Sequence, residues 1–229
     1  MFILKSKAII AGLDEAGRGA VIGPMVIAGV SVTGSGLKKI KALGVRDSKE
    51  LAPKRREKLA KQIEKIAKDI LIVKVGPCKI DNYKKEGINL NRLEAIKFAE
   101  ILNYLNPHLA YIDSPENNTQ RFEKMLSKMT NVNFIAEHYA DKKYPIVSAA
   151  SILAKVERDK EMAKIRKKYG VRGSGYPSDT ETIAWMREYL KEHKDFPEGL
   201  VRMSWATTQA LIAKRRQSKL KEFFKRIIG

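Results

Sequence analysis

Cysteine and histidine are scarce in this sequence of 229 residues. Cys78 is the single cysteine, and the three histidines (His108, His138 and His193) show no spacing typical of a metal site. One cysteine excludes an internal disulfide and a cysteine-based zinc cluster, and it fits the reducing environment of the cytoplasm. A bound metal is therefore expected to be a hard cation that prefers oxygen ligands.

Long apolar runs are also missing. No stretch reaches the roughly 20 residues that cross a membrane, and Lys5 and Lys7 interrupt the apolar N-terminal segment, which argues against a signal peptide. Acidic residues are outnumbered, with 26 Asp and Glu against 45 Lys and Arg and a net charge of +19. This excess is typical of a nucleic-acid binder, the alternative being a lysine-rich solvated surface. We expect a cytoplasmic monomer.

Hydrophobic periodicity predicts early strands that follow one another closely and later strands separated by helices. Strands are predicted over 8–13, 21–32 with a bend at Gly23-Pro24, 70–75, 109–112 and 132–137. Helices are predicted over 54–68, 89–105, 120–128, 145–169, 180–193 and 204–214. This order favours an α/β fold in which helices flank a mixed sheet and a helical lobe follows at the C-terminus.

Acidic residues occur where predicted elements end or begin. Asp14 and Glu15 follow the first strand, Asp113 follows the buried segment 110–112, and Asp141 precedes the long helix. Buried carboxylates are tolerated mainly when they are paired or bound to metal. Two Mg²⁺ or Mn²⁺ ions held by such carboxylates would activate a water and stabilise the leaving oxygen of a phosphoryl displacement. Each acid taken singly, Asp141 above all, could instead cap a helix or pair with a surface cation.

Five short segments occur in order at 14–19, 46–49, 111–114, 148–155 and 174–179. They read Asp-Glu-Ala-Gly-Arg-Gly, Arg-Asp-Ser-Lys, Tyr-Ile-Asp-Ser, Ser-Ala-Ala-Ser-Ile-Leu-Ala-Lys and Ser-Gly-Tyr-Pro-Ser-Asp. With these segments the chain resembles the archaeal type of ribonuclease HII, the type 2 ribonuclease H, over nearly its whole length. The resemblance implies a ribonuclease H-like five-stranded mixed sheet flanked by helices, with a helical C-terminal extension. We expect a catalytic domain in 1–170, a helical lobe in 171–213 and a basic tail in 214–229.

The resemblance also implies an activity and a set of catalytic residues. The protein would be an endonuclease that hydrolyses RNA in RNA–DNA hybrids, including single ribonucleotides embedded in duplex DNA, and leaves 5′-phosphate and 3′-hydroxyl ends. Its catalytic residues and ligands for Mg²⁺ or Mn²⁺ would be Asp14, Glu15, Asp113 and Asp141, with two ions held when substrate is bound.

Two segments are expected to read the sugars of the substrate. By resemblance the loop Gly17, Arg18 and Gly19 contacts the ribose 2′-OH, the group that DNA lacks. Glycine suits this contact because backbone atoms can approach closely, although an ordinary turn would use glycine as well. Tyr176, on a turn between glycine and proline, would pack on the deoxyribose after the ribonucleotide, where an aromatic ring can stack.

Three further residues are expected near the phosphates. Lys49 is similar to a family lysine near the cleaved phosphate. Ser148 and Ser151 fall in the first turns of the predicted long helix, whose N-terminus offers unpaired N–H groups to a phosphate. Capping of the helix or hydrogen bonding within it is the competing explanation for both serines.

The last residues match a pattern for binding a sliding clamp. It consists of a glutamine, two residues, an aliphatic residue, two residues and an aromatic pair, here Gln217, Leu220, Phe223 and Phe224. In a helical turn the three apolar side chains would share one face and fit a hydrophobic groove. The alternative is a last helix that packs this face on the body of the protein.

Three other functions compete with this interpretation. A type 3 ribonuclease H would not cut at a single embedded ribonucleotide, and the Gly-Arg-Gly loop together with Tyr176 argues against it. A catalytically silent, clamp-associated nucleic-acid binder would need no carboxylate cluster. A metal-dependent phosphatase explains neither the basic composition nor the tail.

Overall fold

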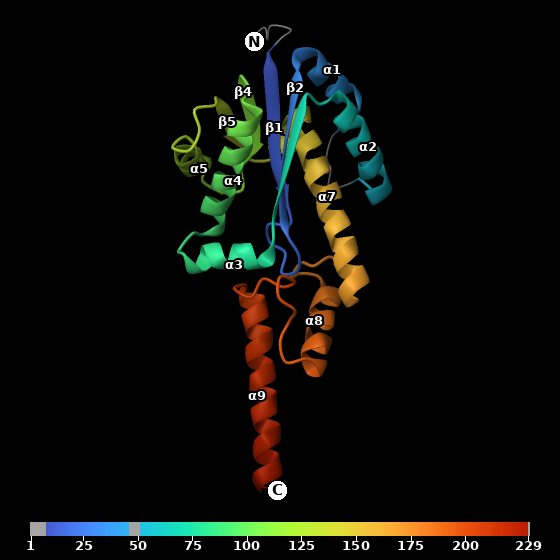
Figure 1. Ribbon diagram of the computed structural model, residues 1–229, viewed down its shortest axis with the longest axis vertical. Coiled ribbons are helices and arrows are strands. Elements are labelled where there is room, and N and C mark those ends of the chain that lie inside the picture. The colour runs from blue at the N-terminus through green and yellow to red at the C-terminus, as the bar shows by residue number, and fades with distance from the viewer. Residues whose placement is uncertain (1–7, 46–50, 229) are drawn as a thin grey trace. The chain divides into compact units, whose positions relative to one another are not determined.

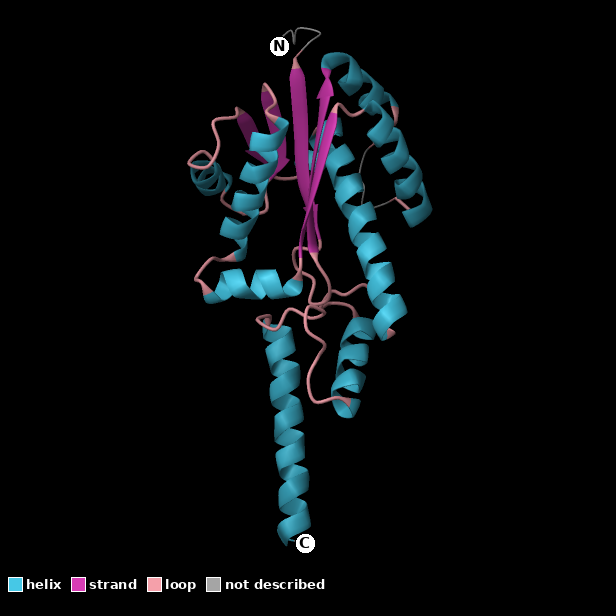
Figure 2. Ribbon diagram, in the orientation of Figure 1, coloured by secondary structure: helices cyan, strands magenta, loops and turns pink. Residues whose placement is uncertain are grey.

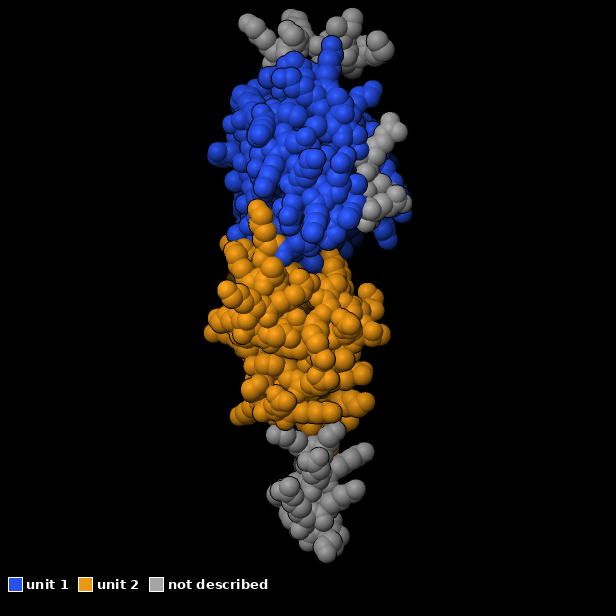
Figure 3. Space-filling model, turned by 90° about the vertical axis from the view of Figure 1, so that its right-hand side faces the viewer, with its two compact units in different colours: residues 1–18, 25–74, 88–159 blue, residues 19–24, 75–87, 160–229 orange. Residues whose placement is uncertain are grey.

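The computed structural model of the protein describes residues 8–45 and 51–228, with side chains up to Gln217. The chain divides into two compact units (Figure 3). The first comprises Met1–Arg18, Met25–Lys74 and Ile88–Asp159, and the second comprises Gly19–Pro24, Val75–Gly87 and Lys160–Gly229. Each unit has its own hydrophobic core.

The first unit is built on one five-stranded sheet (Figure 1). Its strands are β1 Ile9–Ala16, β2 Met25–Thr33, β3 Asp69–Val75, β4 Leu109–Asp113 and β5 Phe134–Glu137. They lie in the order β3-β2-β1-β4-β5, with β1 antiparallel to β2 and parallel to β4, and β4 parallel to β5. The sheet is therefore mixed and has β1 at its centre, which confirms the predicted fold class.

Helices cover both faces of this sheet (Figure 2). They are α1 Gly34–Ala42, α2 Pro53–Ile66, α4 Leu90–Leu105, α5 Thr119–Leu126, the short α6 Ala140–Lys143 and the first part of α7 Pro145–Tyr169. On one face, Ile10 and Val30 of the sheet pack in one hydrophobic cluster with Ile63 of α2 and Ile152 of α7. On the other face, α4 lies so close to β2 that a Cβ on Gly29 would be 2.2 Å from Ile101.

Gly12 explains how closely α7 approaches the centre of the sheet. A Cβ at this position would lie 2.3 Å from the carbonyl oxygen of Ile146, a distance that no side chain allows. Glycine therefore lets the start of α7 rest directly on β1. Residues two apart on a strand share a face, so Asp14 points to the same side of the sheet, next to α7.

The second unit contains α3 Pro77–Lys85, α8 Thr180–Glu192 and α9 Ala206–Ile228. Its core includes Val21, Ile22, Trp185, Met186 and Leu200. Among the helices in the described part of the chain, none combines the length and apolarity that crossing a membrane requires.

One predicted strand, 21–32, is wrong at its beginning. The backbone N–H groups of Val21 and Ile22 donate to the carbonyl of Gly175, and Ile22 forms an isolated bridge with Val201. Gly23 then turns the chain at φ 79°, and β2 starts at Met25. The Gly-Pro pair therefore separates two segments that belong to different units, because Pro24 has no N–H to continue a ladder.

Candidate metal centre

The central strand β1 runs through the acidic pair. The sequence predicted a strand that ends at Leu13, but pairing with β2 continues with Asp14 opposite Ala28 and Glu15 opposite Ile27. The predicted end was wrong because pairing with β2 extends β1 by three residues beyond its apolar run, through Ala16. Successive side chains on a strand leave it toward opposite faces, yet at this strand end the side chains of Asp14 and Glu15 still hydrogen-bond to each other.

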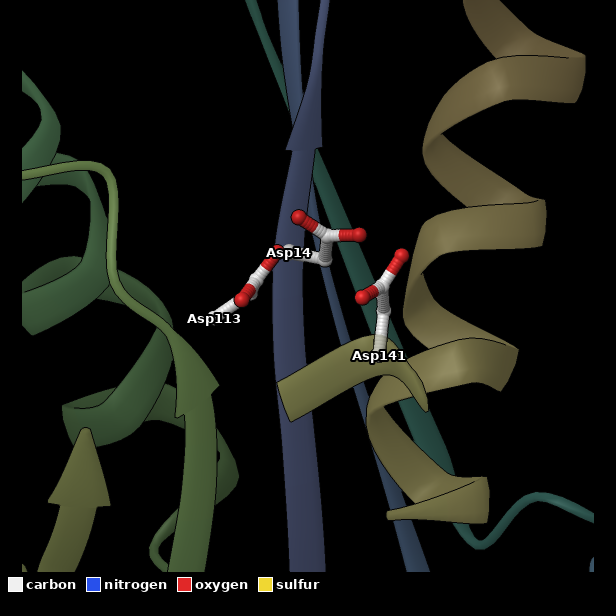
Figure 4. A group of neighbouring side chains, drawn as sticks. All are labelled: Asp14, Asp113 and Asp141. Carbon is white, nitrogen blue, oxygen red and sulfur yellow. The ribbon is translucent and has the colours of Figure 1, made fainter. Parts of the chain in front are cut away.

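Three aspartates gather on the α7 side of the sheet. The parallel register pairs Leu13 with Ile112, so the next residues, Asp14 and Asp113, are neighbours across the two strands. Asp141 comes from α6, and one carboxylate oxygen from each of the three lies within 4.8 Å of the others (Figure 4). The sheet order thus brings these predicted site residues together.

Hydrogen bonds hold two of the three aspartates in place. The Asp14 carboxylate accepts a bond from the backbone N–H of Glu15 at 2.7 Å and another from the Ser151 hydroxyl on α7. Asp113 Oδ1 accepts from the backbone N–H of Ala140 at 2.9 Å. Tyr139, just before that N–H, adopts the left-handed conformation with φ 57°, a strained arrangement for a tyrosine that is typical of functional sites.

Asp141 is buried, at 2% exposed, and neither of its carboxylate oxygens has a hydrogen-bond partner among the described residues. Burial raises the pKa of Asp14 well above its usual value, and the charges of Glu15 and Asp113 raise it further. A buried charge without a partner is costly, and carboxylates this close repel one another. The group therefore fits a divalent cation with oxygen ligands, which would supply the missing partner and offset the repulsion.

Glu15 follows Asp14 on β1 and lies between the aspartates and α4: its side chain hydrogen-bonds to that of Asp14, and it is close to Glu94 of α4. It is not one of the three residues whose oxygens lie within 4.8 Å. Burial raises the pKa of Glu15 to about 8, the carboxylates of Glu94 and Asp113 add to the rise, and Arg18 opposes it. Of the four carboxylates predicted as ligands, three therefore lie within 4.8 Å of one another, and the fourth, Glu15, is hydrogen-bonded to Asp14 beside them.

The two predicted phosphate-contact serines are fully buried. Ser151 donates to Asp14 and accepts a bond from Lys155 Nζ at 3.0 Å, while the Ser148 hydroxyl has no partner within the described residues. Both serines have 0% exposed surface, so the structure does not place them where a substrate would touch them. Ser151 hydrogen-bonds to Asp14, which agrees with hydrogen bonding within the fold, the alternative that the sequence left open for this serine.

The Gly-Arg-Gly loop follows β1 directly. Gly17 has φ 82°, which favours glycine. Gly19 is exposed, and a Cβ there would meet no atom within 4 Å. The Arg18 side chain turns to α4, where its Nε donates to Glu94 Oε2 at 2.9 Å. Backbone on the open side of this loop is therefore accessible, whereas the guanidinium is engaged.

Tyr176 lies half-buried in a firmly held turn of the second unit. Asp179 accepts hydrogen bonds from the hydroxyl and the backbone N–H of Ser174, and these bonds lower the pKa of Asp179 to about 2. The Thr182 hydroxyl accepts from Gly175 N–H at 2.9 Å. The turn therefore holds the backbone around Tyr176 in one conformation.

Other predicted contact residues lie at or beyond the limits of the described part. Lys49 falls in 46–50, outside the described residues. Helix α9 continues through the clamp-binding pattern to Ile228, and Gln217 is exposed on it. The side chains of Leu220, Phe223 and Phe224 also fall outside the described part.

Glu94 and Asn91 both contact Arg18 from α4, and neither was predicted from the sequence. The sequence does contain a sign that Glu94 has a partner. Glu94 lies between Leu93 and Ala95, and Phe98 and Ile101 follow it four and seven residues later. An acid on the apolar stripe of a helix is expected to have a partner.

The sheet order and the flanking helices define a protein with a ribonuclease H fold, and its group of three aspartates is a candidate site for a metal ion. Comparison with known proteins is more specific, since a sequence profile of the family described as ribonuclease HII matches residues 11–208. The chain is 47% identical to the ribonuclease HII of Pyrococcus furiosus over 225 residues, which cover 95% of this chain and 99% of that relative.

Two solved structures of ribonuclease HII proteins are similar to this chain. The ribonuclease H2 from Pyrococcus horikoshii OT3 has a TM-score of 0.84 at 43% identity and covers 91% of this chain and 99% of its own. A chain of the PCNA:RNase HII complex from Archaeoglobus fulgidus has a TM-score of 0.81 at 42% identity, covering 88% and 96%. The chain therefore belongs to the ribonuclease HII family, hydrolases that cleave RNA in RNA–DNA hybrids.

Proposed function

We propose that this hydrolase cuts RNA–DNA hybrids and also duplex DNA that contains a single ribonucleotide, on the 5′ side of that ribonucleotide. The observation that carries the proposal is the group of three aspartates within 4.8 Å, with both oxygens of buried Asp141 lacking a hydrogen-bond partner among the described residues. Phosphodiester hydrolysis at such a group leaves a 5′-phosphate and a 3′-hydroxyl.

Asp14, Asp113 and Asp141 are proposed to hold two divalent cations, Mg²⁺ or Mn²⁺, with Glu15 completing the site beside them. Bound there, the cations supply an activated water and stabilisation of the leaving oxygen. The protein's own contribution is orientation. Ser151 fixes Asp14 through its hydroxyl, and the Ala140 N–H fixes Asp113, so that both carboxylates are aimed before the substrate arrives.

Selection of RNA is assigned to the loop that follows the acidic pair. The exposed backbone at Gly19 is available to contact a ribose 2′-OH, the group that distinguishes RNA from DNA. Tyr176 is assigned to the deoxyribose on the other side of the junction, and Lys49 to the phosphate. The net charge of +19 suits a substrate with a phosphate backbone.

Cleavage of an end-labelled DNA duplex with one ribonucleotide tests this function, with Mg²⁺ and with Mn²⁺. A single cut on the 5′ side is expected from the wild-type protein, with a loss of at least about 10³-fold in Asp14→Asn and Asp141→Asn. Asp69→Asn is the control, since Asp69 is a partly exposed partner of Lys68. Cleavage of long hybrids alone would refute the single-ribonucleotide activity, and full activity in Asp141→Asn would refute the metal site.

We also propose that the C-terminal tail binds a sliding clamp, for which PCNA is the candidate. Support comes from the pattern of Gln217, Leu220, Phe223 and Phe224, from the helical backbone over these positions, and from the similar chain in a complex with PCNA. Phe223→Ala with Phe224→Ala should abolish binding to an archaeal PCNA in calorimetry while cleavage of short duplexes is unchanged. Lys225→Ala is the matched control, and unchanged affinity in the double variant would refute the proposal.

A further inference from the structure

Glu94 is a buried acid that the metal centre does not use. Its side chain is 0% exposed on α4, and a glutamate is rarely buried to this degree unless it is paired. The partner is Arg18, whose Nε donates to Glu94 Oε2 at 2.9 Å while its side chain is 34% exposed. The pair therefore joins the interior of the first unit to the loop that follows β1.

Asn91 contacts the same guanidinium. Its Oδ1 accepts a hydrogen bond from Arg18 Nη2, and it lies three residues before Glu94, so both acceptors are on one face of α4. A guanidinium is a rigid planar fork, and two acceptors at two of its nitrogens fix its orientation as well as its position. We call Asn91 and Glu94 together the α4 clamp.

The α4 clamp restrains a backbone segment that has glycine on both sides of Arg18. Arg18 lies between Gly17, at φ 82°, and Gly19, around which a side chain would find open space. Glycine loses more conformational freedom on ordering than any other residue. Anchoring Arg18 to a helix restricts both neighbouring glycines and leaves the exposed side of Gly19 open.

The α4 clamp also interacts electrostatically with Glu15 of the acidic pair. The carboxylate of Glu94 raises the pKa of Glu15, and Arg18 lowers it. Glu15 precedes Arg18 by three residues, so the charges of the clamp, the loop and the end of β1 form one connected cluster.

We propose that Asn91 and Glu94 are positioning residues for ribose recognition, which act through Arg18 to hold the Gly17–Gly19 backbone in the conformation that contacts the 2′-OH. This inference rests on the proposed function, which gives that contact to the same loop. It also gives Arg18 a different role from the one that the resemblance implied. Its guanidinium faces α4 and anchors the loop, and the backbone meets the substrate.

The test is the ratio of affinities for two duplexes that differ by one 2′-OH, measured by fluorescence anisotropy in Mg²⁺. Asp141→Asn serves as the background that prevents cleavage. In that background, Glu94→Gln keeps the size of the side chain and removes its charge. The preference for the ribonucleotide duplex should fall roughly fivefold, the worth of one hydrogen bond, with the affinity for the all-DNA duplex unchanged.

Further variants separate positioning from general stability. Asp81→Asn is the matched control, because Asp81 is also a buried acid, at 7% exposed, and accepts bonds from the N–H groups of Met203 and Ser204. It should lower stability and leave the preference unchanged. Asn91→Ala should reduce the preference in the same direction as Glu94→Gln, and Arg18→Lys, which keeps the charge without the fork, should reduce it partly.

The outcomes are distinguishable. A folded Glu94→Gln variant with an unchanged preference for the ribonucleotide duplex would overturn the role of the α4 clamp. If that variant does not fold, Asn91→Ala and Arg18→Lys test the proposal instead, because both side chains are partly exposed. An unchanged preference in both of these variants would also overturn the role of the α4 clamp. Absence of any preference in the background protein, together with failure of the wild type to cut the ribonucleotide duplex, would instead refute the proposed function.

Discussion

Replacing Glu15 with glutamine should stabilise the metal-free protein at alkaline pH. Burial and the carboxylates of Glu94 and Asp113 raise the pKa of Glu15 from 4.5 to about 8. A carboxyl group with a higher pKa in the folded than in the unfolded state keeps its proton more tightly when folded. The contribution of Glu15 to the free energy of unfolding should therefore be largest below pH 4.5, fall as the pH rises, and level off above pH 8. Glutamine has no proton to lose and should not show this fall.

The size of the effect follows from the pKa. A rise of about 3.5 pH units at about 1.4 kcal/mol per unit gives an upper limit of about 5 kcal/mol at pH 8. Glutamine also loses the attraction of Arg18, which lowers the pKa of Glu15 in the wild type. We therefore expect Glu15→Gln to be more stable than the wild type by about 2–4 kcal/mol at pH 8 and nearly equal to it at pH 4.5.

Urea unfolding in EDTA, followed by circular dichroism at pH 4.5, 6 and 8, measures this difference. Glu64→Gln, at an exposed position of α2, is the control for loss of one glutamate. Added Mg²⁺ should stabilise the wild type, by about 2.7 kcal/mol at 100 times its dissociation constant, and so reduce the advantage of the variant. A variant whose stability falls with pH as steeply as that of the wild type would refute the reasoning.

Three other substitutions test the packing, the backbone strain and the turn. Gly12→Ala should lower the free energy of unfolding in urea by about 3 kcal/mol, because its Cβ would lie 2.3 Å from the carbonyl oxygen of Ile146. Tyr139→Asn should raise it by up to about 1 kcal/mol, because asparagine adopts the left-handed conformation at φ 57° more readily than tyrosine; an unchanged value would contradict the strain. Asp179→Asn should lower the melting temperature at pH 6 but not at pH 2, because hydrogen bonds from Ser174 hold the pKa of Asp179 at about 2. That contribution is present above the usual pKa of an aspartate and is lost as the pH falls through 2.

The sheet could be predicted from the sequence because each strand has an apolar run of its own. Helix α1 could not, since it begins with Gly34-Ser-Gly36, residues that read as a turn. It forms because the Thr33 hydroxyl caps it, accepting from Gly36 N–H at 3.2 Å, and because Ile40 is fully buried against the sheet. Local propensity was outweighed here by tertiary packing.

The site could be predicted where it depends on neighbouring strands and not where it depends on distant pairing. Asp14 and Asp113 follow apolar segments that lie side by side in the sheet, so their position at strand ends was enough to bring them together. The pair of Arg18 and Glu94 joins residues 76 apart in the sequence. Nothing in the spacing of either residue indicates the other, because the packing of α4 on the sheet alone makes them neighbours.

The adjacency of Asp14 and Glu15 gains its meaning from the strand that carries them. Had β1 ended at Leu13, both side chains could have turned to the same cations. Because the strand continues, Asp14 joins Asp113 and Asp141 on the α7 face, whereas Glu15, hydrogen-bonded to Asp14, lies close to Glu94 of α4. One strand thus connects the acids proposed to bind metal with the loop proposed to read the ribose.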